Sequence, residues 1–272
     1  MTSLIVFSDI DGTLIDHDDY TWEPARPALE MLKKTRTPLI LVSSKTRLEI
    51  LKLRGEMGIT DPFVSENGGG VFIPPDSEIE PPPEAVFREG YWVRSFGASR
   101  LEIQQGFNLL AGKRPMTALS GLDSAEISAL TGLSPAQADL ARQREYGEVF
   151  LLENPEVHEK PLAAEAKALG LNITRGGRFH HLLGGSDKGR AVSWLIGLYR
   201  SKYPRLVTAA VGDAPNDLAM LAVVDRAFLA AAPDGSHRPL VLPGLIRTPS
   251  PGPAGFRQAI FALLDVREDR RE

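Results

Sequence analysis

The feature that most restricts the fold is an alternation of short apolar runs with segments of helical periodicity. Runs such as Leu4–Phe7 and Pro38–Val42 are apolar throughout, as in strands that are buried on both faces of a sheet. Helical spacing follows each of them, over about 24–34 and from Ile50 to Met57. Because strands that alternate with helices form parallel pairs, the pattern predicts an α/β fold with a doubly wound, mostly parallel sheet.

The alternation stops in the middle of the chain and later resumes. Prolines at 74–75 and 81–83 interrupt it, and Gly184-Gly185 marks its return. The elements predicted between these points follow no strict alternation: strands at 91–96, 149–152, 171–174 and 178–183, and helices at 103–110, 124–130, 135–145 and 161–169. The elements predicted after them are strands at 206–211 and 227–230, and helices at 187–199, 218–224 and 254–264. We therefore expect a core domain in two parts with an α+β domain inserted between them, over 1–82, 83–184 and 185–272.

Composition and charge exclude several classes of function. The chain has 31 Lys and Arg against 35 Asp and Glu, so it lacks the excess of positive charge that is typical of nucleic-acid-binding proteins. It contains no cysteine, which excludes disulfides, thiolate catalysis and cysteine-rich metal sites. We find neither a signal peptide before Asp9 nor an apolar stretch of the ~20 residues that span a membrane. We expect a cytoplasmic protein with neither nucleic acid nor a membrane as a partner.

The sharpest motif is Asp9-Ile10-Asp11-Gly12, directly after the first predicted strand. Ligands of α/β sheets bind at the carboxyl ends of the strands. Because residues two apart in an extended chain point to the same side, the carboxylates of Asp9 and Asp11 lie together and repel unless a cation joins them. Mg²⁺ binds to a few carboxylates together with water and phosphate oxygens, so the motif is consistent with an Mg²⁺ site. An ordinary turn with solvated Asp side chains is the alternative interpretation of this motif alone.

A second acidic motif, Gly212-Asp213-Ala214-Pro215-Asn216-Asp217, follows the strand predicted at 206–211. Asp213 is placed to reach a cation held by Asp9. Asp217 comes one helical turn later, where it and Asn216 are expected to orient ligands from a second layer. Asp and Asn also cap helices, but the position at the end of another core strand favours the metal site.

Two single residues complete the set of candidates. Ser43, with Ser44 behind it, ends the second predicted strand and is suited to donate a hydrogen bond to a phosphoryl oxygen. Lys188 stands at the start of a predicted helix, where its charge and the helix dipole both favour an anion. Alone, each is an ordinary turn or surface residue. Only their combination with the two acidic motifs indicates a function.

Taken in chain order, these residues resemble the four motifs of phosphatases of the haloacid-dehalogenase superfamily. The motifs are Asp-x-Asp-Gly-Thr, a serine at a strand end, a lysine at a helix start and Gly-Asp-x-x-x-Asp. The insert at 83–184 is similar in position to the large α+β cap of the subgroup that includes sugar phosphatases. The resemblance covers the whole chain and implies a Rossmann-like core with a cap domain.

The resemblance also implies a role for each motif residue. Asp9 is expected to be the nucleophile, and Asp11 the acid toward the leaving oxygen and then the base toward water. Mg²⁺ is expected to be bound by Asp9, the backbone carbonyl of Asp11 and Asp213, while Ser43 and Lys188 bind the transferred phosphoryl group. This division of roles agrees with the need of phosphoryl transfer for positioning and charge neutralisation. Strand register alone favours Ser43 over Ser44.

Shorter stretches resemble the mannosyl-3-phosphoglycerate phosphatases within this superfamily, at 43–47, 65–69, 142–146, 178–182 and 186–189. They imply hydrolysis of mannosyl-3-phosphoglycerate to mannosylglycerate and phosphate. Such a substrate carries a carboxylate and sugar hydroxyls beside its phosphate, and Arg binds a carboxylate in a bidentate way. The candidate contacts are Lys45, Arg47, Glu66, Asn67 and Arg178. Surface ion pairs and turns are the alternative role for all five, and His180 and His181 receive no role.

Three other functions remain open at this point. One is a generic sugar phosphatase that acts on hexose, sucrose or trehalose phosphate. The second is a phosphosugar mutase on the same scaffold, which returns the phosphoryl group to sugar, and the third is an inactive binding module. We expect the cap to close over the substrate around the proline-rich and diglycine junctions. The oligomeric state is left open by the sequence.

Overall fold

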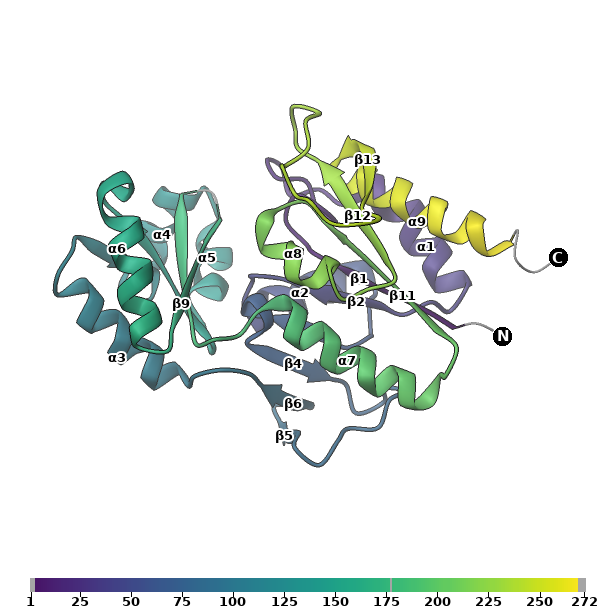
Figure 1. The fold of residues 1–272 in the computed structure, drawn as a ribbon, viewed down its shortest axis with the longest axis horizontal. Coiled ribbons are helices and arrows are strands. Elements are labelled where there is room, and N and C mark those ends of the chain that lie inside the picture. Colours follow the sequence, from purple (N-terminus) through teal and green to yellow (C-terminus); the bar gives the residue numbers. More distant parts are fainter. Residues whose placement is uncertain (1–2, 177, 269–272) are drawn as a thin grey trace.

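The computed structural model describes residues 3–176 and 178–268, and its largest feature is a nine-stranded sheet (Figure 1). The strand order is β13-β12-β11-β1-β2-β3-β4-β6-β5. The bounds are β1 Ser3–Ser8, β2 Leu39–Val42, β3 Phe63–Ser65, β4 Gly70–Ile73, β5 Val86–Arg88, β6 Tyr91–Ser95, β11 Leu206–Gly212, β12 Arg226–Ala231 and β13 Ile246–Pro251. The strands from β13 to β3 run parallel, and β4, β6 and β5 add antiparallel pairs at one edge. The predicted α/β class with a mostly parallel sheet is confirmed.

Helices cover both faces of this sheet. They are α1 Arg26–Lys34, α2 Arg47–Met57 and α9 Gly252–Glu268 on one face, and α7 Lys188–Lys202 and α8 Leu218–Leu221 on the other, with short 3₁₀ turns η1 Glu23–Ala25, η2 Glu66–Gly68 and η4 Pro215–Asp217. Alternate side chains of β1 enter the two layers: Val6 packs with α1 and α9, and Phe7 packs with α7. Within the part of the chain that the structure describes, no helix combines the length and apolar character needed to cross a membrane.

A four-stranded antiparallel sheet forms from the middle of the chain and lies beside the large sheet (Figure 1). Its order is β7-β8-β10-β9. The elements of this unit are β7 Met116–Ala118, β8 Gly147–Leu152, β9 Asn172–Gly176, β10 Phe179–Leu183, α3 Arg100–Ala111, η3 Leu119–Gly121, α4 Ser124–Thr131, α5 Pro135–Ala141 and α6 Pro155–Ala168. Helices α3 and α6 pack with Phe150 on one face, whereas α4 and α5 pack with Val149 on the other.

The change from one sheet to the other occurs later than residue 83, where we expected the insert to begin. β5 and β6 hydrogen-bond into the large sheet, because β6 pairs with the exposed edge of β4. The proline-rich segments therefore lie in the loop between β4 and β5. The two chain crossings between the sheets lie side by side, since the Ala98 N–H donates to the carbonyl oxygen of Gly184 at 2.8 Å. We propose that the inserted domain spans about 97–184 in place of 83–184.

Several elements differ from the sequence-based expectation, among them α6, β4 and β13. Helix α6 begins at Pro155 and contains Pro161, which we had placed at its start. Pro155 stands in the first turn, where a proline costs no hydrogen bond, but Pro161 lies inside the helix, so taking it as the helix start placed that start six residues too late. Strand β4 was not predicted because it follows a run of glycines, and β13 was not predicted because it contains two prolines.

The core of the inserted domain depends on Phe150, which is fully buried. Its ring centroid lies 5.6 Å from that of Phe107 and 5.4 Å from that of His180. We expect Phe150→Ala to lower the free energy of unfolding by about 3–5 kcal/mol, because it leaves a cavity. Urea denaturation followed by circular dichroism measures the change. Val157→Ala, at a position 61% exposed on α6, is the control and should change it by less than about 0.5 kcal/mol. A Phe150→Ala loss as small as that of the control would contradict the packing.

Candidate active site

The acidic motifs meet at the carboxyl ends of two neighbouring strands. β1 and β11 are parallel, and Ser8 pairs with Val211, so Asp9 and Asp213 leave the sheet at the same edge. The chain turns at Gly12, whose φ is +71°, and a Cβ there would lie 2.8 Å from Oδ2 of Asp213. Glycine is therefore needed at position 12 both for the turn and for the close approach of Asp213.

Three carboxylates gather at this edge, from Asp9, Asp213 and Asp217. One oxygen of each lies within 4.8 Å of the others. Burial, with repulsion from Asp217 and Asp213, raises the pKa of Asp9 against the effect of Lys188. Burial and the charge of Asp217 raise the pKa of Asp213 to about 6, although Thr13 donates a hydrogen bond to Asp213 Oδ1 at 3.1 Å. The cluster therefore holds more negative charge than its surroundings neutralise.

Lys188 is the buried cation of the cluster. Its Nζ donates to Oδ1 of Asp9 at 2.7 Å and to Oδ1 of Asp217 at 2.6 Å, and its side chain is fully buried. Burial, the largest single effect, lowers the pKa of Lys188, but the carboxylates of Asp217 and Asp9 outweigh it and raise the pKa. Lys188 is the first residue of α7, and the side chain of Asp187 caps that helix by accepting from the Arg190 N–H.

Asp217 and Asn216 support the loop that carries Asp213. Oδ2 of Asp217 accepts from the N–H groups of Asp213 and Ala214, both at 3.0 Å. Asn216 donates through Nδ2 to Oδ1 of Asn67 at 3.2 Å, so the loop after β11 contacts the loop after β3. These contacts hold the backbone of the acidic motif in place. Asp217 and Asn216 were the residues that we expected to support the metal ligands from outside.

The loop after β2 faces Asp11. Ser43 is fully buried, and its Oγ accepts from the Lys45 N–H at 3.2 Å. Lys45 Nζ lies 2.9 Å from Oδ1 of Asp11 and 3.8 Å from Oε1 of Glu49. Burial lowers the pKa of Lys45 as the largest single effect, but Asp11 and Glu49 together outweigh it and raise the pKa. We expected Lys45 to bind a substrate carboxylate, but in the structure it pairs with Asp11.

The oxygen ligands of the cluster suit a divalent cation. Carboxylate oxygens are hard ligands, and Asp9, Asp213 and Asp217 together carry more charge than Lys188 balances. The carboxylate of Asp11 is directed to Lys45, so a contribution from Asp11 would come from its backbone carbonyl. Of the three carboxylates, those of Asp9 and Asp213 are the better ligands, because both oxygens of Asp217 already accept hydrogen bonds.

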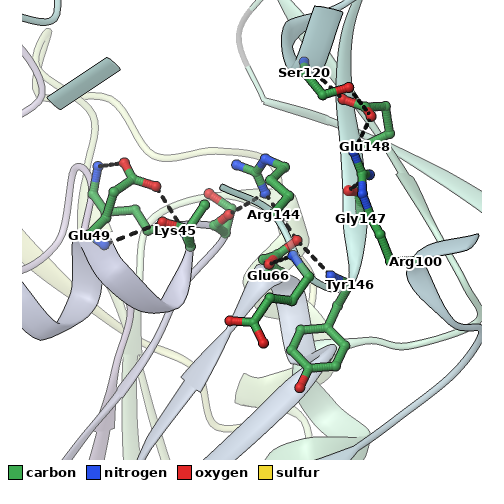
Figure 2. A network of polar contacts seen from close by, with 12 residues as sticks. Lys45, Glu49, Glu66, Arg100, Ser120, Arg144, Tyr146, Gly147 and Glu148 are labelled. Carbon is green, nitrogen blue, oxygen red and sulfur yellow. Dashed lines mark hydrogen bonds and ion pairs between the residues drawn. The ribbon is translucent and has the colours of Figure 1, made fainter. Parts of the chain in front are cut away.

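The remaining predicted contacts lie at or beyond the boundary with the inserted domain. Glu66 is fully buried and accepts from the N–H groups of Glu145 at 2.7 Å and Tyr146 at 3.1 Å (Figure 2). Arg47 Nε donates to Oε1 of Glu145 at 2.8 Å. Arg178 is exposed, and its guanidinium stacks on the ring of Phe179. Glu66 and Arg47 therefore join the two domains, while Arg178 contacts none of the catalytic candidates.

Two residues near the site were missed by the sequence analysis. Arg144 reaches from the inserted domain to the Ser44 carbonyl, to which its Nη1 donates at 3.1 Å. Burial and the nearby charges of Arg144, His180 and Lys188 lower the pKa of His181 to about 3, so this imidazole is neutral. The alternation of β10 indicates that His180 and His181 face opposite ways, but no local signal showed which one faces the core.

Comparison with known proteins agrees with this geometry. The family described as haloacid dehalogenase-like hydrolase matches residues 6–80. The chain is 41% identical over 263 residues to a protein from Methanococcoides burtonii named glucosyl-3-phosphoglycerate/mannosyl-3-phosphoglycerate phosphatase, covering 96% of this chain and 97% of that protein. A protein of the same name from Persephonella marina is 35% identical over 267 residues, with the same coverage. A solved sugar phosphatase of haloacid dehalogenase subclass IIB has the same fold, with a TM-score of 0.68 at 16% identity over 96% of this chain and 99% of that one.

The raised pKa of Asp213 predicts how cation binding depends on pH. Its value in the folded protein, about 6, lies above the ordinary 3.8, so the folded state binds the proton more tightly. Without a cation, this carboxyl therefore lowers stability as the pH rises from about 4 to about 6. Because a cation must displace that proton, added Mg²⁺ should raise the melting temperature more at a pH of about 7.5 than at about 5.

Differential scanning fluorimetry with and without Mg²⁺ measures this difference. Asp213→Asn is the comparison variant, and it should show a small shift at both pH values because it lacks the titrating ligand. An equal Mg²⁺ shift at both pH values in the unaltered protein would contradict the assignment.

Proposed function

This chain belongs to the haloacid dehalogenase-like hydrolases, in the group of the glucosyl-3-phosphoglycerate/mannosyl-3-phosphoglycerate phosphatases, and we propose that it hydrolyses mannosyl-3-phosphoglycerate through a phosphoryl group on Asp9. It is a phosphatase. The names of the relatives favour the glucosyl compound as a second substrate. The observation that carries the mechanism is the buried contact of Asp9 with Lys188 at 2.7 Å, within one cluster with Asp213.

In the first step an oxygen of Asp9 attacks phosphorus. Lys188 holds Oδ1 of Asp9, which fixes the direction of the carboxylate and places positive charge beside the reacting oxygens. The bond from phosphorus to the ester oxygen of the glycerate breaks, and that oxygen leaves as the alcohol after it takes a proton from Asp11. The Ser43 hydroxyl, buried at the end of β2, is placed to donate to a phosphoryl oxygen.

In the second step water attacks phosphorus and frees Asp9. Asp11 now takes the proton of that water, and the products are inorganic phosphate and the regenerated carboxylate. Lys45, whose Nζ lies 2.9 Å from Oδ1 of Asp11, fixes the position of this carboxylate. A single residue thus serves the leaving oxygen and the attacking water, which occupy the same side of the phosphoryl group at different times.

We propose Mg²⁺ as the cofactor, bound by the carboxylates of Asp9 and Asp213 and the backbone carbonyl of Asp11. When bound, it supplies charge neutralisation for the phosphoryl oxygens and lowers the repulsion between the carboxylates. Asp217 keeps the Asp213 backbone in place through its two N–H contacts. Asn216 ties the same loop to Asn67.

Asp9→Asn tests the nucleophile. The change removes the attacking charge but almost no volume, so we expect turnover to fall by at least roughly 10³-fold with little change in melting temperature. Phosphate release under steady-state conditions measures it. Asp18→Asn is the control, because the Asp18 side chain is 85% exposed in the same region, and it should keep full activity. Retained activity in Asp9→Asn would exclude the covalent route.

A substrate panel tests the specificity. We expect kcat/KM for mannosyl-3-phosphoglycerate to exceed that for hexose phosphates, sucrose phosphate and trehalose phosphate by roughly 10-fold or more, because buried polar groups discriminate strongly between polar substrates. The assay measures phosphate release with Mg²⁺ present. A preference for simple hexose phosphates would identify a generic sugar phosphatase, and an isomeric phosphosugar as product would identify a mutase.

A further inference from the structure

We propose that Arg144 binds the carboxylate of the phosphoglycerate part of the substrate and that Glu66 positions Arg144 for this contact. The inference rests on the proposed function, because it concerns the anionic group that separates glycosyl phosphoglycerates from simple sugar phosphates. Arg144 lies in the segment 142–146, which joins α5 to β8. It takes the place that we had assigned to Arg178.

Arg144 comes from the inserted domain but lies at the phosphate end of the core. Its Nη1 donates to the carbonyl oxygen of Ser44 at 3.1 Å (Figure 2). Ser44 stands between Ser43, the expected phosphoryl ligand, and Lys45, which is paired with Asp11. The guanidinium of Arg144 thus contacts the loop that carries the expected phosphoryl ligand, and a phosphoglycerate carries its carboxylate close to its phosphate.

The hydrogen-bonding capacity of Arg144 is only partly used. Its side chain is 8% exposed, and the carboxylate paired with it is that of Glu66, whose Oε2 lies 3.6 Å from Nη1. Among residues 3–176 and 178–268, Nε of Arg144 is buried and has no hydrogen-bond partner. A buried N–H group without an acceptor is unfavourable. A carboxylate is a suitable acceptor for this donor, because it accepts from Nε and a terminal nitrogen of arginine at the same time.

Glu66 holds the backbone beside Arg144 in place. Its two oxygens accept from the N–H groups of Glu145 and Tyr146, the two residues after Arg144. Before Arg144, the Leu140 carbonyl accepts from the hydroxyl of Thr46 at 2.9 Å. The segment is thus bound to the core on both sides of Arg144. Because Glu66 is fully committed to these backbone contacts, it acts through Arg144 and does not contact the substrate.

Several other described cations of the inserted domain have partners within that domain. Arg100 pairs with Glu148 at 2.6 Å, and Lys113 pairs with Glu165 at 2.9 Å. Arg178 is exposed and stacks on Phe179. His181 lies near Arg144 but is neutral at physiological pH, because burial lowers its pKa to about 3. Arg144, in contrast, has its contacts with the core, to the Ser44 carbonyl and the Glu66 carboxylate.

The test compares substrates with and without the carboxylate. Arg144→Met should lower kcat/KM roughly 10- to 100-fold on mannosyl-3-phosphoglycerate, since the bidentate contact is lost. The same variant should stay within about 3-fold of the unaltered enzyme on the methyl ester of that substrate and on p-nitrophenyl phosphate. Arg144→Lys keeps the positive charge but cannot make the bidentate contact. Its kcat/KM on mannosyl-3-phosphoglycerate should lie between those of Arg144→Met and the unaltered enzyme. Arg142→Met is the matched control, because Arg142 is exposed two residues away, and it should change neither rate.

A double-mutant cycle tests the positioning role of Glu66. Glu66→Gln should raise KM for mannosyl-3-phosphoglycerate while leaving kcat on p-nitrophenyl phosphate unchanged. In the Arg144→Met background the same change should have no further effect on KM, because the residue that it positions is already absent. Additive losses in the double variant would overturn the positioning role.

The outcomes separate this inference from the proposed function. Equal losses on the acid, its methyl ester and p-nitrophenyl phosphate in both Arg144→Met and Arg144→Lys would overturn the role of Arg144 alone. An unaltered enzyme that hydrolyses neither glycosyl phosphoglycerate would reject the proposed function and the inference with it, whereas one that hydrolyses acid and ester equally well would reject the inference alone. If the unaltered enzyme prefers the acid to its methyl ester and only the Arg144 variants lose this preference, the result supports the proposed function and the role of Arg144.

Discussion

The ion pairs of Lys188 with Asp9 and Asp217 are the interaction on which the rest of the site depends. A buried ammonium without partners is costly, so these two carboxylates must stay beside it. The three residues come from the start of α7, the end of β1 and the turn η4. Their contact joins these three segments at the carboxyl ends of the strands. Because one lysine cannot balance Asp9, Asp213 and Asp217 together, the same cluster is suited to bind a divalent cation.

A second buried charge, that of Glu66, connects the inserted domain to this edge. Its carboxylate accepts backbone N–H groups from the segment that carries Arg144, and Thr46 holds the other end of that segment. The loops that bear Ser43 and Glu66 follow neighbouring strands, β2 and β3, so the contact between domains forms directly above the proposed phosphate site. If the inserted domain moves and Arg144 binds substrate as proposed, a movement that frees this segment would also withdraw Arg144, so closure and substrate recognition would be coupled.

The large sheet and the acidic motifs were predictable because their signals are local. A few consecutive residues are enough to recognise the apolar runs of β1, β2 and β11, and the Asp residues directly after β1 and β11. The pairing of β5 and β6 with β4 in the large sheet was not predictable, because the glycines and prolines around these strands carry no information on pairing partners. The contacts of Lys45 with Asp11 and of Glu66 with the backbone beside Arg144 were not predictable for a similar reason. They join residues far apart in the chain, and only the folded arrangement brings them together.

The claim that Asp9 carries the phosphoryl group is tested most directly by rapid quench of the Asp11→Asn variant with p-nitrophenyl phosphate. p-Nitrophenolate leaves without a proton, so the first step proceeds, whereas hydrolysis of the phosphorylated enzyme lacks its base. We expect a burst of about one equivalent of p-nitrophenol per active site. We also expect that acid-quenched protein carries phosphate on the peptide that contains Asp9. Release that is linear from the first turnover, together with an unmodified Asp9, would contradict this claim.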